Sequence, residues 1–294
     1  MKIKVPATSA NLSAGFDCLG LAIKLYNEVI VKPSSLQIVS IKGEGEDRPH
    51  MKRKNPFVSI FHETILELTG RSDNYRFEFI NKIPFSRGLG SSSAVIVGAI
   101  ASAYKMAGLK VDKQAVLNRA LLYENHPDNI APAVYGGFTA SIVHGKRVVV
   151  QKKALPEDLC SVVVIPNEPM STAKSRTLLP KQYKMCDIVW NISHSSFLSA
   201  AFMREDWDLL KLAAQDALHE EKRMGQMPIL FDVRRVSYEN GSLMSTLSGS
   251  GSTFFNLSYK KDAKRLENAL KESFKDFRVE VFDVDNDGFL IQDI

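Results

Sequence analysis

The organisation of the chain follows from one stretch, Pro84-Phe85-Ser86-Arg87-Gly88-Leu89-Gly90-Ser91-Ser92-Ser93-Ala94. Residues 74–83 before it alternate polar and apolar side chains, which predicts a β-strand. Residues 94–106 after it are small and mostly apolar, which predicts a buried helix. Glycines let a ligand approach the backbone, and the free N–H groups at a helix start attract anions. The stretch therefore predicts a phosphate site, and a simple glycine turn whose serines cap the helix is the alternative.

The loop differs from two widespread nucleotide-binding motifs. A Walker A loop has a Lys directly after its last glycine, and this loop has none there. Ser93 stands where the third glycine of a dinucleotide-binding fingerprint would be. We therefore expect a different class of phosphate site.

The composition is typical of a soluble globular protein. The chain has 294 residues, of which 45% are hydrophobic and 24% charged, enough for one large domain or two ordinary ones. No apolar run reaches the roughly 18 to 20 residues that span a bilayer. The N-terminus lacks the apolar region of a signal peptide. We expect a cytoplasmic protein that does not contact membranes.

Cysteine usage agrees with a reducing compartment. Cys18, Cys160 and Cys186 are widely spaced and odd in number, which favours free thiols. No group of Cys and His residues has the spacing of a zinc site.

The positive charge is concentrated in the first half of the chain. Residues 1–150 hold 19 Lys or Arg against 12 Asp or Glu, whereas the remainder holds 19 against 21. A basic half suits an anionic small ligand or a nucleic acid. The charge alone does not choose between them.

Hydrophobic periodicity predicts an α+β protein with two halves. Residues 26–31 and 36–41 are expected to pair as strands around a turn at Pro33, and residues 7–20 to form a loop. His126-Pro127-Asp128-Asn129 is expected to end a helix that Asp112 caps, and 156–158 is the best domain boundary. Further strands are expected at residues 2–6, 138–143, 147–151, 161–165, 254–257 and 278–283, and further helices at 57–68, 187–203, 206–223 and 262–274.

Several stretches together resemble one enzyme superfamily. Residues 84–94 resemble the phosphate loop of the GHMP kinases, the superfamily named after galactose, homoserine, mevalonate and phosphomevalonate. Residues 248–252, Ser-Gly-Ser-Gly-Ser, resemble its C-terminal glycine motif, which usually has Pro where this chain has Ser252.

Two further stretches look specifically like motifs of the homoserine kinases. These are residues 8–20 and residues 124–132, the latter followed by Gly136-Gly137. Asn125 departs from the pattern, which commonly has Gly there. The resemblance covers nearly the full length, and the motifs occur in the family's order.

The resemblance implies a two-domain GHMP-kinase-like fold of the α+β class with the active site in the interdomain cleft. Residues 1–155 would form the N-terminal nucleotide-binding domain and residues 156–294 the C-terminal domain. The implied reaction is the ATP-dependent phosphorylation of the hydroxyl of L-homoserine to O-phospho-L-homoserine, a step of threonine biosynthesis. A homodimer is also implied.

Phosphoryl transfer depends mainly on positioning and on charge neutralisation. The resemblance assigns the triphosphate of ATP to residues 84–94. It assigns Mg²⁺, which prefers hard oxygen ligands, to one loop serine and to Glu124. Ser92 is our choice for that serine, and Ser93 is the alternative.

Other phosphate and adenine contacts rest on family position. Asn55 would contact adenine, or it caps the helix that begins at Pro56. Arg87 and Lys174 are further candidates for neutralising phosphate charge.

The substrate residues also follow from the resemblance. Asn11 and Asp17 suit the ammonium group of homoserine. Arg176 and Arg223 suit its carboxylate, because a guanidinium group can bind a carboxylate with two parallel hydrogen bonds. An arginine taken alone lies more often on the surface, and it is the motif context that favours a substrate role.

The residues nearest the reacting hydroxyl come from one segment. We predict Glu124, Asp128 and Asn129 as the catalytic group and count His126 and Asn129 as substrate ligands. Related kinases place an Asp near the hydroxyl. The homoserine kinase pattern suggests instead that Asn129 holds substrate and that a phosphate oxygen or water takes the proton. The sequence leaves the identity of the base open.

Two other functions fit parts of the sequence. A GHMP-type kinase for a mevalonate- or shikimate-like substrate would not use the clamp of Asp17 with two arginines, because those substrates lack an ammonium group. A non-catalytic RNA-binding module fits the basic N-terminal half. The glycine loop and Glu124 argue against it, as does the lack of aromatics interleaved with arginines. We therefore expect small-molecule partners and no nucleic acid.

Overall fold

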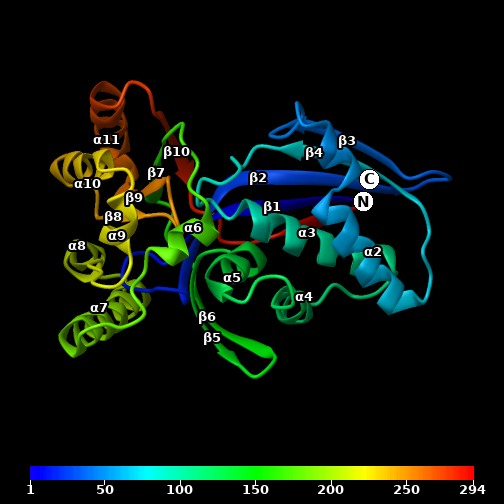
Figure 1. Ribbon diagram of the computed structural model, residues 1–294, viewed down its shortest axis with the longest axis horizontal. Helices are drawn as coiled ribbons and strands as arrows, with labels where there is room; N and C mark the ends of the chain where they lie inside the picture. The colour runs from blue at the N-terminus through cyan, green and yellow to red at the C-terminus, as the bar shows by residue number, and fades with distance from the viewer.

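Two β-sheets, one in each lobe, organise the structure, which is a computed structural model (Figure 1). It describes residues 1–294, with the side chains of all but residues 172 and 173. The two sheets and their helices form two lobes that lie side by side. Among the described residues, no helix combines the length and the apolarity needed to cross a bilayer.

The first sheet has seven strands, in the order β11-β1-β2-β4-β3, with β5 joined to β2 and β6 joined to β5. The long strand β2 pairs with β5 through Leu19–Leu21 and with β4 through Glu28–Pro33. It therefore links two parts of the sheet. The strands are β1 (Lys2–Ala10), β2 (Leu19–Pro33), β3 (Ile38–Gly43), β4 (Tyr75–Asn81), β5 (Phe138–His144), β6 (Arg147–Lys153) and β11 (Leu290–Gln292).

The expected hairpin of residues 26–31 with 36–41 is wrong. Strand β4 lies between β2 and β3, and β3 runs parallel to β4. Phe77 and Phe79 of β4 are buried and pack against Phe57. This strand needs neighbours on both sides, whereas β3 has mostly exposed residues that suit a sheet edge. The turn at Pro33 ends β2 but does not determine its partner.

Helices cover one face of the first sheet, as Figure 1 shows for α2 and α3. The predicted helix at 57–68 is confirmed, because Asn55 caps it and Gly70 ends it with a φ of 69°. The helix capped by Asp112 is also present, but it ends at Ala120. The helices of this half are α1 (Pro49–Arg53), α2 (Pro56–Thr69), α3 (Ser91–Met106), α4 (Lys113–Ala120) and α5 (Pro127–Tyr135).

Helix α5 was not expected from the sequence. Pro127 occupies the first turn of this helix. Amides in the first turn have no partner within the helix, so the N–H group that proline lacks costs no hydrogen bond. Pro132 lies inside the helix and cannot donate to the carbonyl of Asp128. That carbonyl faces Gly20 of β2, where a Cβ atom would lie 1.9 Å from it. The small residue lets α5 approach the sheet closely.

The second sheet is antiparallel, in the order β10-β7-β9-β8. Strand β7 is buried throughout, with Val162 and Val164 in one core and Val163 and Ile165 in the other. A strand covered on both faces explains its unbroken apolar run. The strands are β7 (Leu159–Ile165), β8 (Met244–Leu247), β9 (Phe254–Tyr259) and β10 (Arg278–Asp283).

The predicted helix at 206–223 is wrong as a continuous element. Asp216 accepts hydrogen bonds from the backbone amides of His219 and Glu220, so a new helix begins there. Helices α6 and α10 had not been expected. The helices of this half are α6 (Thr172–Thr177), α7 (Met185–Arg204), the 3₁₀ helix η1 (Trp207–Leu209), α8 (Leu210–Ala213), α9 (Glu220–Met224), α10 (Ile229–Glu239) and α11 (Lys260–Ser273).

The two ends of the chain meet on the first sheet. Lys2 of β1 pairs with Gln292 of β11, and Figure 1 shows both termini close together. The last strand therefore returns to the N-terminal lobe. The domain boundary at residue 155 falls in the connection between β6 and β7 and stays a prediction.

Candidate active site

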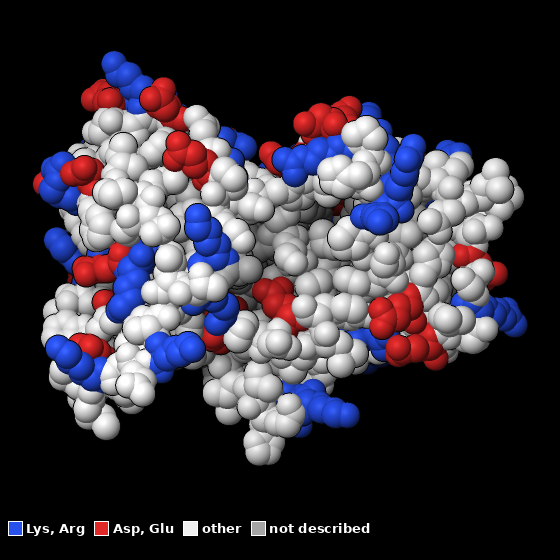
Figure 2. All heavy atoms as spheres, viewed as in Figure 1, with Lys and Arg blue, Asp and Glu red and all other residues white. Residues whose placement is uncertain are grey.

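A cleft of about 300 Å³ lies between the lobes, and Figure 2 shows the hollow on this face. All of the predicted substrate, catalytic and metal residues line it, as does most of the glycine loop. Of the predicted nucleotide residues, Phe85, Ala94 and Asn55 do not line it.

The start of α3 presents free backbone amides to the cleft. Its N-cap is Gly90, with a φ of 67°, and among the described residues no side-chain hydrogen bond caps the helix. The expectation that a serine caps this helix is therefore wrong. A Cβ atom at Gly90 would lie 1.9 Å from the hydroxyl oxygen of Thr8, so the position requires glycine. Uncapped amides at a helix start can bind an anion.

The two glycine motifs contact each other. The Ser248 hydroxyl donates to the carbonyl of Gly88 at 2.6 Å, and the Thr253 amide donates to the carbonyl of Arg87 at 3.1 Å. A Cβ atom at Gly88 would lie 2.0 Å from the Ser248 carbonyl. The C-terminal motif therefore supports the phosphate loop from the other lobe.

Arg87 and Asn55 make contacts within the protein. The Arg87 guanidinium donates to the carbonyls of Phe85, Pro166 and Asn167, which ties the loop to the second lobe. The Asn55 side chain accepts from the Phe57 amide at 3.0 Å, as the N-cap alternative expected. Contacts of these two residues with ATP stay predictions.

Glu124 is paired with a loop serine. The Ser93 hydroxyl donates to Oε2 of Glu124 at 2.6 Å, whereas Ser92 is exposed one residue earlier. Burial raises the pKa of Glu124, although Ser93 and Arg176 favour its ionised form. Carboxylate and hydroxyl oxygens are ligands that Mg²⁺ accepts, so this pair fits the metal. The role of Ser92 stays a prediction.

The metal would need further oxygen ligands besides this pair. Within the part of the chain that the structure describes, no three His, Cys, Asp or Glu side chains gather in a metal-binding group. Mg²⁺ in kinases keeps several waters and binds substrate phosphates. The pair formed by Ser93 and Glu124 is compatible with that arrangement.

Asp17 lies on a loop with unusual backbone angles. Asn11, Leu12, Ser13 and Asp17 all have positive φ, a conformation that is uncommon for residues other than glycine. The Asn11 side chain accepts from the Asp17 amide at 3.0 Å and donates to the Gly249 carbonyl at 2.9 Å. Asn11 therefore stabilises the loop, and its predicted contact with substrate is untested.

The carboxylate of Asp17 pairs with Arg176. Their atoms Oδ1 and Nη2 are 2.6 Å apart, and Oδ2 and Nη1 are 3.2 Å apart. Nδ1 of His126 lies 3.2 Å from Oδ2 of the same carboxylate. The sequence assigned Asp17 and Arg176 to opposite ends of the substrate. The structure joins them directly, through side chains that are 24% and 36% exposed.

Arg223 is buried without an acidic partner. Its side chain lines the cleft, yet the residue is only 2% exposed. Its Nη1 donates to the Gly249 carbonyl at 3.0 Å and lies 3.2 Å from Nδ1 of His219. None of the ion pairs found among the described residues includes Arg223. Burial, with the nearby Arg176, lowers its pKa.

Asp128 and Asn129 lie at the start of α5. Asn129 accepts a hydrogen bond from the Thr8 hydroxyl at 2.7 Å. Burial, together with the charges of Asp17 and Glu124, raises the pKa of Asp128 to about 8. In the ligand-free protein Asp128 therefore keeps its proton at neutral pH.

The sequence interpretation missed residues that support the site. The Phe16 ring centre lies 5.4 Å from the Arg176 guanidinium and 5.3 Å from that of Arg223. His219 contacts Arg223 from one helical turn earlier, a spacing that could have revealed it. Thr8 belongs to the stretch of residues 8–20, but the sequence did not predict a role for it.

A larger groove of about 940 Å³ lies elsewhere in the second lobe. It is bordered by α7, α8, α9 and α10, and no predicted site residue lines it. The smaller cleft holds the glycine loop and the charged residues, and it is the candidate site.

Comparisons with known proteins agree on one family. The model "GHMP kinases N terminal domain" matches residues 57–137, and the model "GHMP kinases C terminal" matches residues 198–276. The homoserine kinase of Campylobacter concisus (strain 13826) is 59% identical over 291 residues, which cover 99% of both chains. That of Campylobacter fetus subsp. fetus is 56% identical and is covered completely. The crystal structure of homoserine kinase from Cytophaga hutchinsonii has a TM-score of 0.89 at 29% identity, covering 99% of this chain and 97% of that one.

The raised pKa of Asp128 predicts a pH-dependent stability. The unfolded chain releases this proton near the ordinary value of 3.8, whereas the folded protein keeps it to about 8. The contribution of Asp128 to the free energy of unfolding is therefore full below pH 3.8 and falls as pH rises towards 8. The slope is at most about 1.4 kcal/mol per pH unit.

Urea denaturation of the wild type and of Asp128→Asn at about pH 5 and about pH 8 measures this contribution. We expect the stability of the variant relative to the wild type to increase with pH. Asp232→Asn, at an exposed position of α10, is the control. A difference that is the same at both pH values would contradict the raised pKa.

Proposed function

The chain belongs to the homoserine kinase family of the GHMP kinases and phosphorylates the hydroxyl group of L-homoserine with ATP, and we propose that it does so in the cleft between the two lobes. The family and the α+β fold expected from the sequence are confirmed. These relatives decide against the other two functions, a kinase for a mevalonate- or shikimate-like substrate and an RNA-binding module.

The buried charge of Arg223 is the main observation that supports the cleft as the substrate site. An ionised group in a protein interior is costly unless it is paired. Arg223 has a carbonyl and an imidazole as partners but no acidic group, and it faces the cleft. The carboxylate of homoserine supplies the missing negative charge. Arg176, on the same aromatic ring, is the second ligand of that carboxylate.

Substrate binding exchanges the partners of Asp17 and Arg176. Homoserine carries one ammonium and one carboxylate, so it can insert into this ion pair without changing the net charge. The ammonium then pairs with Asp17, and the carboxylate with Arg176. A partly exposed ion pair contributes only about 0 to 1 kcal/mol, so opening it costs little. The pair keeps both charges neutralised while the site is empty.

ATP binds with its phosphates at the start of α3. The free amides after Gly90 and the helix dipole attract the triphosphate. Ser93 and Glu124 would hold Mg²⁺, with the Ser92 hydroxyl beside them. Bound Mg²⁺ neutralises negative charge on the phosphates. Arg87 and Lys174 would add positive charge at this end of the cleft.

The hydroxyl of homoserine attacks the γ-phosphorus, and the bond from that phosphorus to ADP breaks. Asn129, held by Thr8, orients the substrate beside the loop. The pKa of Asp128 is raised to about 8 in the protein without ligands, so we do not assign the proton of the hydroxyl to Asp128. We assign that proton to a phosphoryl oxygen or to water. Asp128 serves as a hydrogen-bond donor in the cleft.

The proposal extends to the cellular location and the partners of the enzyme. We place it in the cytoplasm, where its three free thiols stay reduced. Its partners are homoserine and ATP, and we propose no nucleic-acid or membrane partner. The homodimer implied by the sequence resemblance stays a prediction.

Arg223→Lys tests the carboxylate contact. The variant keeps the charge but loses the planar donor group that binds a carboxylate. A charge-assisted hydrogen bond contributes about 1.5 to 3 kcal/mol, so the KM for homoserine should rise about ten- to hundredfold. ADP release at varied homoserine and ATP measures this, and the KM for ATP should change less than about twofold. Arg235→Lys, at an exposed position of α10, is the matched control. An unchanged homoserine KM would refute the contact.

Asp17→Asn tests the ammonium contact. Asn tolerates the positive φ of this position, and Asn11 still holds the backbone amide. We expect kcat/KM for homoserine to fall by about one to two decades, with the melting temperature nearly unchanged. A variant that lost stability but kept its homoserine kinetics would show that Asp17 only holds the loop.

Glu124→Gln tests the metal site. Glutamine keeps the shape and can accept from Ser93, but it removes the charge. The Mg²⁺ concentration for half-maximal activity should rise about tenfold or more. Activity measured at varied Mg²⁺ tests this, with Glu221→Gln at an exposed position as the control. The same Mg²⁺ dependence in both variants would remove Glu124 from the metal site.

A further inference from the structure

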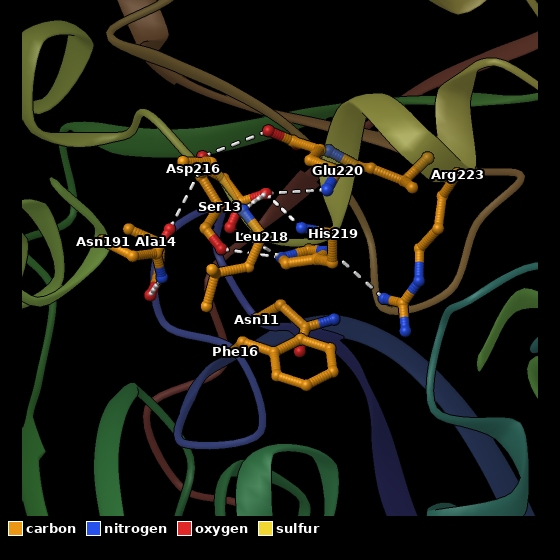
Figure 3. A network of polar contacts seen from close by, with 12 residues as sticks. Asn11, Ser13, Ala14, Phe16, Asn191, Asp216, Leu218, His219, Glu220 and Arg223 are labelled. Atoms are coloured by element: carbon orange, nitrogen blue, oxygen red, sulfur yellow. Dashed lines mark hydrogen bonds and ion pairs between the residues drawn. The ribbon is translucent and has the colours of Figure 1, made fainter. Parts of the chain in front are cut away.

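A buried group of polar side chains lies beside Arg223, and the proposed reaction does not use this group (Figure 3). His219 stands at its centre and is 1% exposed. The ring atom Nε2 of His219 lies 2.9 Å from the Ser13 carbonyl oxygen, and Nδ1 lies 3.2 Å from Nη1 of Arg223. One imidazole therefore links the loop that carries Asn11 and Asp17 to a predicted substrate arginine.

These partners determine which ring nitrogen carries the proton. A guanidinium group can only donate, so Nδ1 of His219 accepts from Arg223. The Ser13 carbonyl can only accept, so Nε2 donates to it. Both bonds require a neutral imidazole with its hydrogen on Nε2. Burial lowers the pKa of His219, and the charge of Arg223 acts in the same direction, although the Asp216 carboxylate opposes them.

The Arg223 guanidinium is held on three sides. The Gly249 carbonyl and Nδ1 of His219 both accept from Nη1. The Phe16 ring lies against the guanidinium at 5.3 Å and against the His219 ring at 4.9 Å. No partner is found for Nε of Arg223 among the described residues. The contacts on Nη1 and on the ring fix the orientation of the remaining donors.

We propose that His219 is a positioning residue, which holds the Arg223 guanidinium in the orientation that receives the carboxylate of homoserine. The inference rests on the proposed role of Arg223. His219 does not line the cleft, so it acts through Arg223 and not on the substrate.

The rest of the buried group keeps His219 in place. Asp216 accepts from the backbone amides of His219 at 2.6 Å and Glu220 at 2.7 Å, which fixes the start of α9. The Glu220 carboxylate accepts from the Ser13 hydroxyl at 3.1 Å and from the Leu247 amide. Ser13 thus contacts Glu220 through its side chain and His219 through its carbonyl. The two contacts can be separated by mutation.

The experiment distinguishes an effect on the carboxylate contact from an effect on the shape of the loop that carries Asn11 and Asp17. Its two probes are homoserine and 3-aminopropan-1-ol, which has the same ammonium and hydroxyl groups but no carboxylate. The KM for homoserine and the inhibition constant of 3-aminopropan-1-ol are measured for the wild type, His219→Leu, His219→Gln and Ser13→Ala. The KM for ATP is measured with them.

His219→Leu should raise the KM for homoserine about tenfold, because Arg223 loses a charge-assisted hydrogen bond. The inhibition constant of 3-aminopropan-1-ol and the KM for ATP should change less than about twofold. His219→Gln should restore most of the homoserine affinity, since its amide can donate to Ser13 and accept from Arg223. Ser13→Ala removes the contact with Glu220 only. It should therefore change the KM for homoserine and the inhibition constant of 3-aminopropan-1-ol to the same extent.

Three results would overturn the inference. His219→Leu could weaken both probes equally, which would show that His219 only shapes the loop. His219→Gln could match His219→Leu, or neither variant could change the homoserine KM. If His219→Leu does not fold, His219→Asn replaces it, because the shorter amide cannot reach both partners. A failure of the proposed function is distinguishable, since it leaves the homoserine KM of Arg223→Lys unchanged.

Discussion

The positive charge of Arg223, buried where the two lobes meet, is the constraint on which the site depends. Burying an ion without a partner of opposite charge is among the most costly arrangements in a protein. The surrounding chain reduces this cost with a carbonyl, an imidazole nitrogen and an aromatic ring. None of these neutralises the charge. Arg223 also lines the cleft, where an anionic group can complete the pairing.

The cleft holds acidic and basic side chains that affect one another, and the charges of the ligands can replace these internal contacts. Asp17, Glu124 and Asp128 lie close enough for their charges to affect one another, and the pKa of Asp128 is raised to about 8. Arg176 limits the repulsion by pairing with Asp17. Each ligand of the proposed reaction brings charges that replace these internal contacts. Binding of homoserine can therefore proceed without a change in the net charge of the cleft.

The contact between the two glycine motifs explains why one site needs both lobes. Gly88 approaches the Ser248 carbonyl so closely that a side chain at this position would collide with it. The phosphate loop belongs to the first lobe, but its conformation is supported from the second. Arg87 adds further bonds across the same junction. The position of the glycine loop relative to Arg223 is thereby fixed.

Local patterns in the sequence were sufficient for much of the fold, and the family resemblance supplied the residues of the candidate site. The helix between Asn55 and Gly70 and the loop at 84–94 could be predicted, because caps, periodicity and turn residues act over a few positions. The partner of β2, the helix after His126 and the interruption at Asp216 could not. They depend on contacts between distant residues, which local patterns do not encode. The same reason applies within the site: the sequence named Asp17, Arg176 and Arg223, but only tertiary packing joined the first two and placed His219 behind the third.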